Sequence, residues 1–141
     1  MVAPAAKTRV FISFDYDHDD DLRVVLLGQA KNHNTPFSFE DWSIKQETKG
    51  WKEDARKRIN RSDVVIVICG HNTHQAVGVT AEISIAREEG VPFHLLRGRK
   101  SGWVRRPQGT SWFWDTLHSW TWPNISSMCT IKPTPWWKKI W

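Results

Sequence analysis

Six consecutive apolar residues, Val64–Cys69 (VVIVIC), constrain the fold more than any other segment of the chain. Asp63 and Gly70 bound this run at its two ends. A strand that is apolar on both faces is typical of the centre of a parallel sheet that helices cover on both sides. We therefore predict a central, fully buried strand over residues 64–69, with the Cys69 thiol in the core.

Shorter apolar segments alternate with stretches of helical spacing along the rest of the chain. β-Branched and aromatic side chains predict three further strands, at residues 9–14, 36–40 and 92–96. Apolar residues at intervals of three and four predict helices over 22–30, 51–61 and 79–90, with Gly90 suited to a C-terminal cap. Residues 41–50 are predicted as a polar loop, and 112–128 contain a candidate final helix. This alternation predicts an α/β fold: a parallel sheet with right-handed crossovers and helices on both faces.

Length and composition limit the class of protein. A chain of 141 residues suits one domain. The two cysteines are too few for a disulfide scaffold or a paired CxxC metal cage, and they favour a reducing compartment. No apolar run approaches the ~18 residues of a membrane span, and the N-terminal segment lacks the apolar stretch of a secretory signal. We expect a cytoplasmic protein without a membrane partner.

The C-terminal third is basic and rich in tryptophan. Residues 91–141 hold eight basic residues, one acidic residue and eight of the ten tryptophans. Such a segment could stack on and neutralise single-stranded nucleic acid, or its indoles could close a small core while basic side chains keep the surface soluble. The pattern is compositional only, so we favour the second interpretation. We divide the chain into a domain at 8–128 and a Trp-rich basic tail at 129–141, and expect Trp136, Trp137 and Trp141 to pack on the domain or across a subunit contact.

The carboxyl ends of the predicted strands mark where a ligand would bind, because open α/β sheets bind ligands at that edge. This rule selects residues 15–17, 70–74 and 97–98. Glu82 lies beside the buried stripe of the third helix, one or two turns below its start. It is either a solvated or arginine-paired glutamate, or a shielded carboxylate that orients ribose hydroxyls and stabilises an oxocarbenium-like transition state. One carboxylate could suffice for NAD, because its nicotinamide leaving group is already cationic.

Several alternative chemistries lack their motifs. Neither GxxxxGK[ST] nor GxGxxG occurs, which argues against a kinase, an ATPase or a Rossmann dehydrogenase. A receiver domain needs an acceptor aspartate where Gly70 and His71 stand. His71 and His74, with Asp15 and Asp17, could bind a metal, but histidines at such spacing often serve as hydrogen-bond donors. We predict no metal.

Five segments together resemble the TIR-like family of bacterial Thoeris ThsB proteins, from Arg9 to Ile125: RVFISFDYDHDDDLR, FEDWSIKQE, WKEDARKRINRSDVVIVICGHNTH, AEISIAREEGVP and WTWPNI. The resemblance implies a flavodoxin-like TIR fold. It also implies that the protein consumes NAD, as a substrate and not a cofactor, to make an ADP-ribose-derived signal during phage infection. That signal would activate a separate effector protein. A phage-derived trigger and a homo-oligomer are further partners that fit this expectation.

The same resemblance assigns roles to particular residues. Glu82 falls where the family places its catalytic glutamate, and the positions expected to bind substrate are Phe14, Asp15, Tyr16, Asp41, Trp42, His71, Asn72, Thr73 and His74. Of these, Asp41 and Trp42 are expected in a mobile loop after the second strand. Gly78 stands where TIR NADases often have the tryptophan of WxxxE. This departure keeps a non-catalytic TIR-like module open, one that binds a nucleotide or a protein without turnover.

Overall fold

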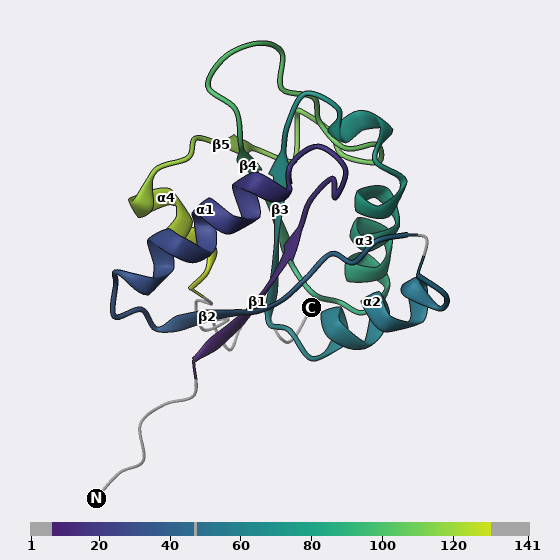
Figure 1. Cartoon of the computed structure of the whole chain (residues 1–141), viewed down its shortest axis with the longest axis horizontal. Helices are drawn as coiled ribbons and strands as arrows, with labels where there is room; N and C mark the ends of the chain where they lie inside the picture. The colour runs from purple at the N-terminus through teal and green to yellow at the C-terminus, as the bar shows by residue number, and fades with distance from the viewer. Residues whose placement is uncertain (1–6, 47, 131–141) are drawn as a thin grey trace, which may run out of the picture.

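A five-stranded parallel sheet forms the centre of the protein, in the order β2-β1-β3-β4-β5 (Figure 1). The structure is a computed structural model and describes residues 7–46 and 48–130. The strands are β1 (Thr8–Ser13), β2 (Phe37–Trp42), β3 (Val64–Cys69), β4 (Phe93–Arg97) and β5 (Leu117–His118). This order is that of flavodoxin-like sheets, so the predicted fold class is confirmed.

The apolar run behaves as predicted. β3 spans residues 64–69, every one of them is buried, and β1 and β4 pair with it on its two sides. Val64, Ile66 and Ile68 belong to one hydrophobic core, and the alternate residues belong to a second core on the other face of the sheet. Burial also raises the pKa of the Cys69 thiol to about 12. This cysteine is a structural residue of the core.

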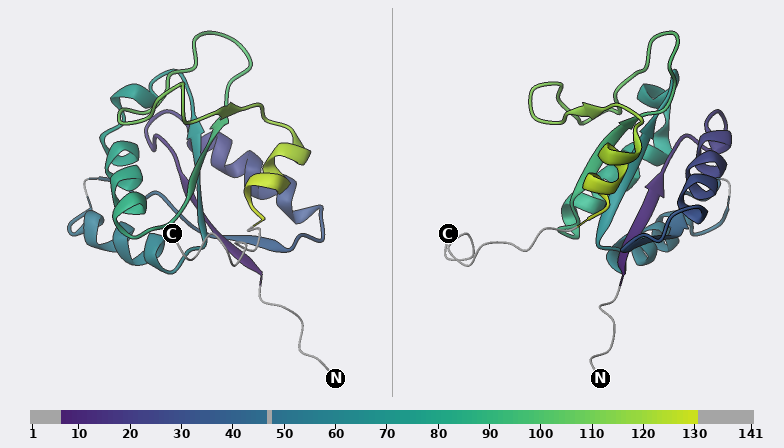
Figure 2. Two further views of the ribbon diagram at one scale, coloured as in Figure 1. Left: turned by 180° about the vertical axis from the view of Figure 1, so that it is seen from behind. Right: turned by 90° about the vertical axis from the view of Figure 1, so that its left-hand side faces the viewer.

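Two helices cover each face of the sheet. α1 (Asp20–Lys31) and α4 (Trp122–Met128) pack on one face, and α2 (Trp51–Asn60) and α3 (Val77–Glu88) pack on the other. Figure 1 shows the two pairs on opposite sides of the strands, and the right-hand view of Figure 2 is taken from the side of α1 and α4. The loops that follow β1, β3 and β4 lie together at the upper edge of the sheet in Figure 1.

Gly90 ends α3 as predicted. Its φ of 70° is left-handed, a conformation that glycine adopts without steric cost. The Gly90 N–H donates to the Arg87 carbonyl at 3.2 Å, and the Val91 N–H donates to the Ala86 carbonyl at 2.8 Å. These two bonds form a Schellman motif, which satisfies carbonyls that the helix end would leave unpaired. The motif turns the chain directly into β4.

β2 is longer than predicted and carries a β-bulge. Val10 pairs with Phe39, but Phe11 pairs with Asp41, so Glu40 is an extra residue in β2. A bulge shifts the alternation of side chains by one position. Phe39 and Trp42 therefore both pack on the core beside α1, whereas Asp41 turns to the α2 side. The prediction that residues 41–50 form a loop was wrong for the first two of them.

The segment after β4 contains the predicted final helix and one further element. The candidate final helix within 112–128 is present as α4, but the short strand β5, which was not predicted, precedes it. The N-cap residue of α4, Thr121, accepts the Asn124 N–H through its side chain at 3.3 Å. Trp120 and Trp122 pack against the core, whereas Trp103, Trp112, Phe113 and Trp114 are 71–82% exposed. The expected packing of Trp136, Trp137 and Trp141 lies outside the described residues. Within those residues, no helix is both long and apolar enough to span a membrane.

Candidate active site

Glu82 is a fully buried carboxylate at the carboxyl-terminal edge of the sheet. It lies in the second turn of α3 and is 1% exposed. Its neighbours along the helix, Val79, Ile83 and Ala86, belong to the core between α3 and the sheet. An ionised carboxylate in such surroundings costs free energy unless polar groups compensate for its desolvation. Polar groups must therefore contact the Glu82 carboxylate.

Two serine hydroxyls from separate strands hold this carboxylate. Ser13 Oγ, at the end of β1, donates to Glu82 Oε1 at 2.8 Å, and Ser43 Oγ, directly after β2, donates to the same oxygen at 2.6 Å. Ser43 Oγ in turn accepts the Phe14 N–H at 3.1 Å. The bulge in β2 makes this arrangement possible, because it leaves Ser43 on the α3 side of the sheet. Glu82 is thus tied to both strands by hydrogen bonds alone.

The environment holds Glu82 near the middle of its titration at neutral pH. Burial raises the pKa of this carboxyl to about 7, although the hydrogen bonds from Ser43 and Ser13 act in the opposite direction. Among the described residues, no lysine, arginine or histidine forms an ion pair with it. A carboxylate that is desolvated but not neutralised by a cation is a common feature of active sites. It is available to stabilise positive charge that develops on a substrate.

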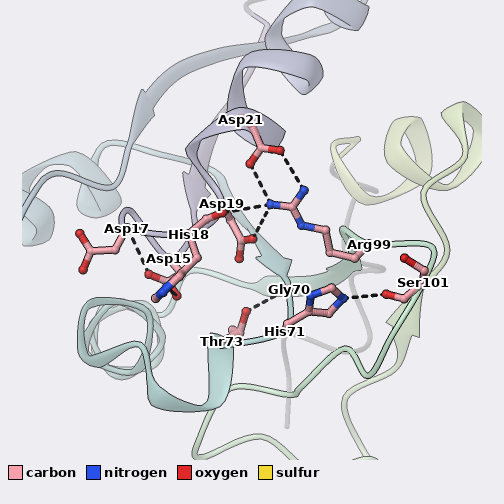
Figure 3. A network of polar contacts seen from close by, with 10 residues as sticks. All are labelled: Asp15, Asp17, His18, Asp19, Asp21, Gly70, His71, Thr73, Arg99 and Ser101. Atoms are coloured by element: carbon pink, nitrogen blue, oxygen red, sulfur yellow. Dashed lines mark hydrogen bonds and ion pairs between the residues drawn. The ribbon is translucent and has the colours of Figure 1, made fainter.

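The loop after β1 adds a second polar group at the same edge. The strand order reverses between β1 and β3, which makes this edge the point where α/β sheets bind ligands. Asp15 Oδ1 accepts the Asp17 N–H at 3.2 Å, and its Oδ2 accepts from His18 Nδ1 at 2.7 Å (Figure 3). The hydrogen bond that His18 donates to Asp15 raises the pKa of His18. These bonds order the loop between β1 and α1.

Arg99, from the loop after β4, clamps the other end of that segment. Its guanidinium donates to both oxygens of Asp21 at 2.8 Å, and to Asp19 Oδ1 and the His18 carbonyl at 3.0 Å (Figure 3). Burial raises the pKa of Asp19, although Arg99 opposes this shift. A Cβ at Gly70 would overlap the Asp19 carboxylate, so this approach requires glycine at the end of β3. The loops after β1, β3 and β4 are therefore interlocked.

Comparisons with known proteins decide the family. The family model described as the TIR-like domain of the Thoeris protein ThsB matches residues 11–98. This chain belongs to the Thoeris ThsB TIR-like family. A comparison with curated proteins gives no match. One similar solved structure is the glutaminase domain of a Trypanosoma brucei CTPS with bound acivicin, at 20% identity and a TM-score of 0.42; the similarity covers 64% of this chain and 36% of that one.

The ThsB TIR-like match includes most of the residues that the sequence singled out, and the structure brings some of them together. Phe14 is buried in the core, so only its N–H reaches Ser43, and its ring stacks on Tyr16 with centroids 5.6 Å apart. Asp15 lies in the ordered loop described above. Lys45 Nζ lies 5.6 Å from the centroid of the Tyr16 ring. The β1 and β2 loops therefore meet at the edge that also holds Glu82.

The residues predicted after β3 divide into buried and exposed groups. Thr73, the first residue of a short 3₁₀ helix, is buried, and its Oγ1 accepts the Gly70 N–H at 2.7 Å. His71 Nε2 donates outward to the Ser101 carbonyl at 2.6 Å (Figure 3), beside the half-buried Asn72. Nδ1 of His74 is buried and lacks a hydrogen-bond partner among the described residues. No group of three or more His, Cys, Asp or Glu side chains within 7–46 and 48–130 could hold a metal ion.

Asp41 and Trp42 occupy places other than the mobile loop that was predicted for them. Both are the last residues of β2. The Asp41 carboxylate accepts from the Arg61 guanidinium at 2.6 and 2.9 Å, and the Arg23 guanidinium lies 5.0 Å from the Trp42 ring centroid. Because they are successive residues of a strand, the two side chains lie on opposite faces of the sheet. Each has a structural partner on the helix beside it.

Gly78 stands at the position where the WxxxE pattern has its tryptophan. It lies one turn before Glu82 on α3, and a Cβ placed there would be 2.8 Å from Gln46 Nε2. The end of the Gln46 side chain, from the loop after β2, thus occupies the space beside Gly78. This packing brings the chain that carries Ser43 close to Glu82.

The sequence did not point to Ser13, Ser43, Asp19 or Arg99. Small hydroxyl residues at strand ends are common, and the acidic run 15–21 does not reveal which carboxylate is buried. The signal for Arg99 was its place just beyond residues 97–98, at the predicted ligand-binding edge.

Proposed function

We propose that the protein is a TIR-type enzyme that cleaves NAD at its nicotinamide–ribose bond, with Glu82 as the catalytic residue. The product is an ADP-ribose-derived signal in anti-phage defence that activates a separate effector. The observation that supports this proposal best is the buried Glu82 carboxylate, which has serine donors but no described cation and a pKa of about 7. Membership of the ThsB TIR-like family agrees with it.

In this reaction the carboxylate would stabilise the positive charge that develops on the ribose. The bond between ribose C1′ and the nicotinamide nitrogen breaks with both electrons going to nitrogen, so neutral nicotinamide leaves and positive charge develops on C1′ and the ring oxygen. A desolvated anion stabilises that charge strongly, because few water molecules screen it. A nucleophile then adds to C1′ and loses its proton: water gives ADP-ribose, and another hydroxyl or ring nitrogen gives a cyclised or transferred product.

The serine hydroxyls suggest how substrate reaches the carboxylate. Both donate to Glu82 Oε1, and Ser43 lies in the segment between β2 and Gln46. A ribose hydroxyl that donates to Glu82 would replace one of these serine hydroxyls, so the number of hydrogen bonds to the carboxylate is conserved. Ser43 is the more suitable one to be replaced, since it lies after β2, whereas Ser13 is the last residue of β1.

Substitution of the carboxylate tests the proposal. Glu82→Gln keeps the shape and removes the charge, so nicotinamide release from NAD should fall at least ~100-fold, the scale of one lost transition-state contact. Release is measured by chromatography, and mass spectrometry identifies the ribosyl product, with and without lysate of phage-infected cells. Circular dichroism confirms folding, and Glu53→Gln, on the exposed side of α2, is the matched control. Undiminished cleavage by folded Glu82→Gln protein would rule out this role.

A non-catalytic nucleotide-binding or protein-interaction module is the second candidate. Gly78 favours it, since the WxxxE tryptophan of many TIR NADases is absent there. This alternative predicts that wild-type protein binds NAD in calorimetry but releases no nicotinamide, even with infected lysate present.

A further inference from the structure

A pocket of about 770 Å³ lies between the loop after β4 and the start of β5, two segments at the upper end of the sheet in the right-hand view of Figure 2. Its walls include Arg97 at the end of β4, Trp103, Arg105 and Arg106 in the loop, and Leu117 of β5. Leu117 packs on the core that α2 and α3 cover. The Arg105 N–H donates to the Gly70 carbonyl at 2.9 Å, which fixes the loop to the end of β3.

Three guanidinium groups line this pocket, and no acidic side chain lines it. Side chains alternate along β4, so that of Arg97 lies on the same face as Leu95, which belongs to the core beside α3. Arg97 and Arg105 are exposed, and the Arg106 guanidinium donates to the main-chain carbonyl of Asp115. None of the three arginines forms an ion pair within the described part of the chain. Three positive charges therefore remain available for an anionic ligand.

Exposed aromatic rings accompany these charges. Trp103 lines the pocket itself and is 82% exposed. The three aromatic residues of the turn at 112–114 are 71–82% exposed, and the centroids of successive rings lie 5.3 and 5.5 Å apart. The hydrogen bond from Arg106 to the Asp115 carbonyl ties this turn to the pocket wall. The tryptophans at these positions therefore do not close a core, as the composition suggested, but present their rings to solvent.

The charge of this surface selects the class of ligand. Residues 97–117 include five basic residues and one acidic residue, Asp115. The Asp115 carboxylate already accepts the Ser111 N–H at 2.9 Å and lies 4.0 Å from Arg87. A ligand must therefore supply several anionic groups together with flat surfaces for the rings. Single-stranded nucleic acid supplies both, because its phosphates bind guanidinium groups and its unpaired bases stack on aromatic side chains.

We propose that this surface binds single-stranded nucleic acid, with phosphates at Arg97, Arg105 and Arg106 and a base stacked on Trp103. The turn at 112–114 offers further rings to neighbouring bases. Contacts to phosphates and to the faces of bases give little sequence preference. Glu82 reaches β1 and β2, whereas this surface borders β4 and β5, so β3 separates the two sites. This inference does not depend on NAD cleavage.

Salt dependence tests the phosphate contacts. The full chain is titrated into fluorescently labelled oligothymidylate of ~12 nucleotides, within the usual range of such sites, and anisotropy gives the affinity. Three phosphate contacts predict a slope of log affinity against log salt of about −2, at about −0.7 for each contact. Arg97→Gln/Arg105→Gln should bring the slope to about −0.7 and weaken binding at low salt at least about tenfold. The control Lys31→Gln/Lys57→Gln, at exposed positions outside the surface, should change neither quantity.

An abasic oligonucleotide of the same length tests the stacking, because it keeps every phosphate and lacks the bases. Wild-type protein should bind it at least about fivefold more weakly than oligothymidylate, the lower end of the effect of one stacked base. Trp103→Ala, at an exposed position where folding is preserved, should weaken oligothymidylate binding by a similar factor without changing the salt slope.

Four results would overturn the proposal. They are no binding of oligothymidylate, an unchanged salt slope in Arg97→Gln/Arg105→Gln, equal affinity for the abasic strand, and unchanged affinity in Trp103→Ala. The second arm of the competition experiment uses polyglutamate at the same concentration of negative charge. If polyglutamate displaces the labelled strand as well as unlabelled oligothymidylate does, the surface recognises acidic polypeptide and the proposal also fails.

Discussion

Replacing Glu82 with glutamine should stabilise the protein at pH 8 but not at pH 5. The folded-state pKa of about 7 lies above the ordinary value of 4.5, so between these values the folded protein holds a proton that the unfolded chain has lost. The free energy of unfolding of the wild type therefore falls as pH rises from about 4.5 to 7 and is level above that on account of this group. Glutamine carries no charge at either pH, so the free energy of unfolding of the variant does not fall in this way.

The size of the effect follows from the shift. The rise from 4.5 to about 7 corresponds to about 3 kcal/mol, at about 1.4 kcal/mol for each pKa unit. Because pH 5 already lies above the ordinary pKa of 4.5, part of this loss is present there, and Glu82→Gln should gain about 2.5 kcal/mol over the wild type at pH 8 relative to pH 5. Every other titrating group is present in both proteins, so its contribution cancels in this difference.

Urea unfolding at pH 5, 6, 7 and 8 measures the effect, with Glu53→Gln as the control for loss of an exposed charge. The control should follow the wild type to within ~0.5 kcal/mol at each pH, the usual range for surface substitutions. If the stability difference between Glu82→Gln and wild type is the same at pH 5 and pH 8, the carboxylate does not titrate in this interval and our account of its environment is wrong.

Three further predictions concern the surroundings of the site and the core. Ser43→Ala should move the rising limb of the pH profile for NAD cleavage to higher pH by about one unit. The hydrogen bond from Ser43 lowers the pKa of Glu82 in the wild type, so its loss raises that pKa; an unmoved midpoint would contradict this. Gly78→Ala should change the free energy of unfolding by less than ~1 kcal/mol, since the exposed Gln46 side chain can swing aside and helix propensity improves; a larger loss would show that Gln46 is fixed. Ile66→Ala, at a fully buried position, should cost 2–5 kcal/mol in urea unfolding, whereas Val24→Ala, at a 55% exposed position, should cost little.

The elements that were predicted correctly depend on local patterns. The apolar run of β3 and the glycine that ends α3 are each specified by residues adjacent in sequence, so periodicity and turn chemistry suffice to place them. The spacing of Glu82 places it beside the apolar stripe of its helix, but spacing alone left open whether the carboxylate is solvated or shielded. Its chemical role rests on the family resemblance and on its environment.

The features of the site that could not be predicted from the sequence depend on contacts between distant segments. Ser13 and Ser43 become donors to Glu82 only once β1, β2 and α3 are packed together, and the Asp19–Arg99 pair joins loops that are 80 residues apart. The position of Ser43 also depends on a bulge that has no distinctive signature of its own. Counting residues in alternation from Phe37 would place Asp41 on the wrong face of the sheet.

The bulge in β2 makes the length of this strand, and not only the identity of its residues, a determinant of the chemistry at Glu82. Glu40 is an exposed side chain with no contact to the site. Deleting it would remove the bulge but leave Asp41, Trp42 and Ser43 on their present faces, because their register with β1 would be unchanged. One residue inserted between Trp42 and Ser43 would instead turn the Ser43 hydroxyl away from α3, so the carboxylate would lose a donor while every residue around it stayed the same. A single-codon insertion at the end of this strand is therefore a route by which a lineage of such proteins can switch this carboxylate between two protonation regimes. A survey that scores only residue identity at the site would not detect the change.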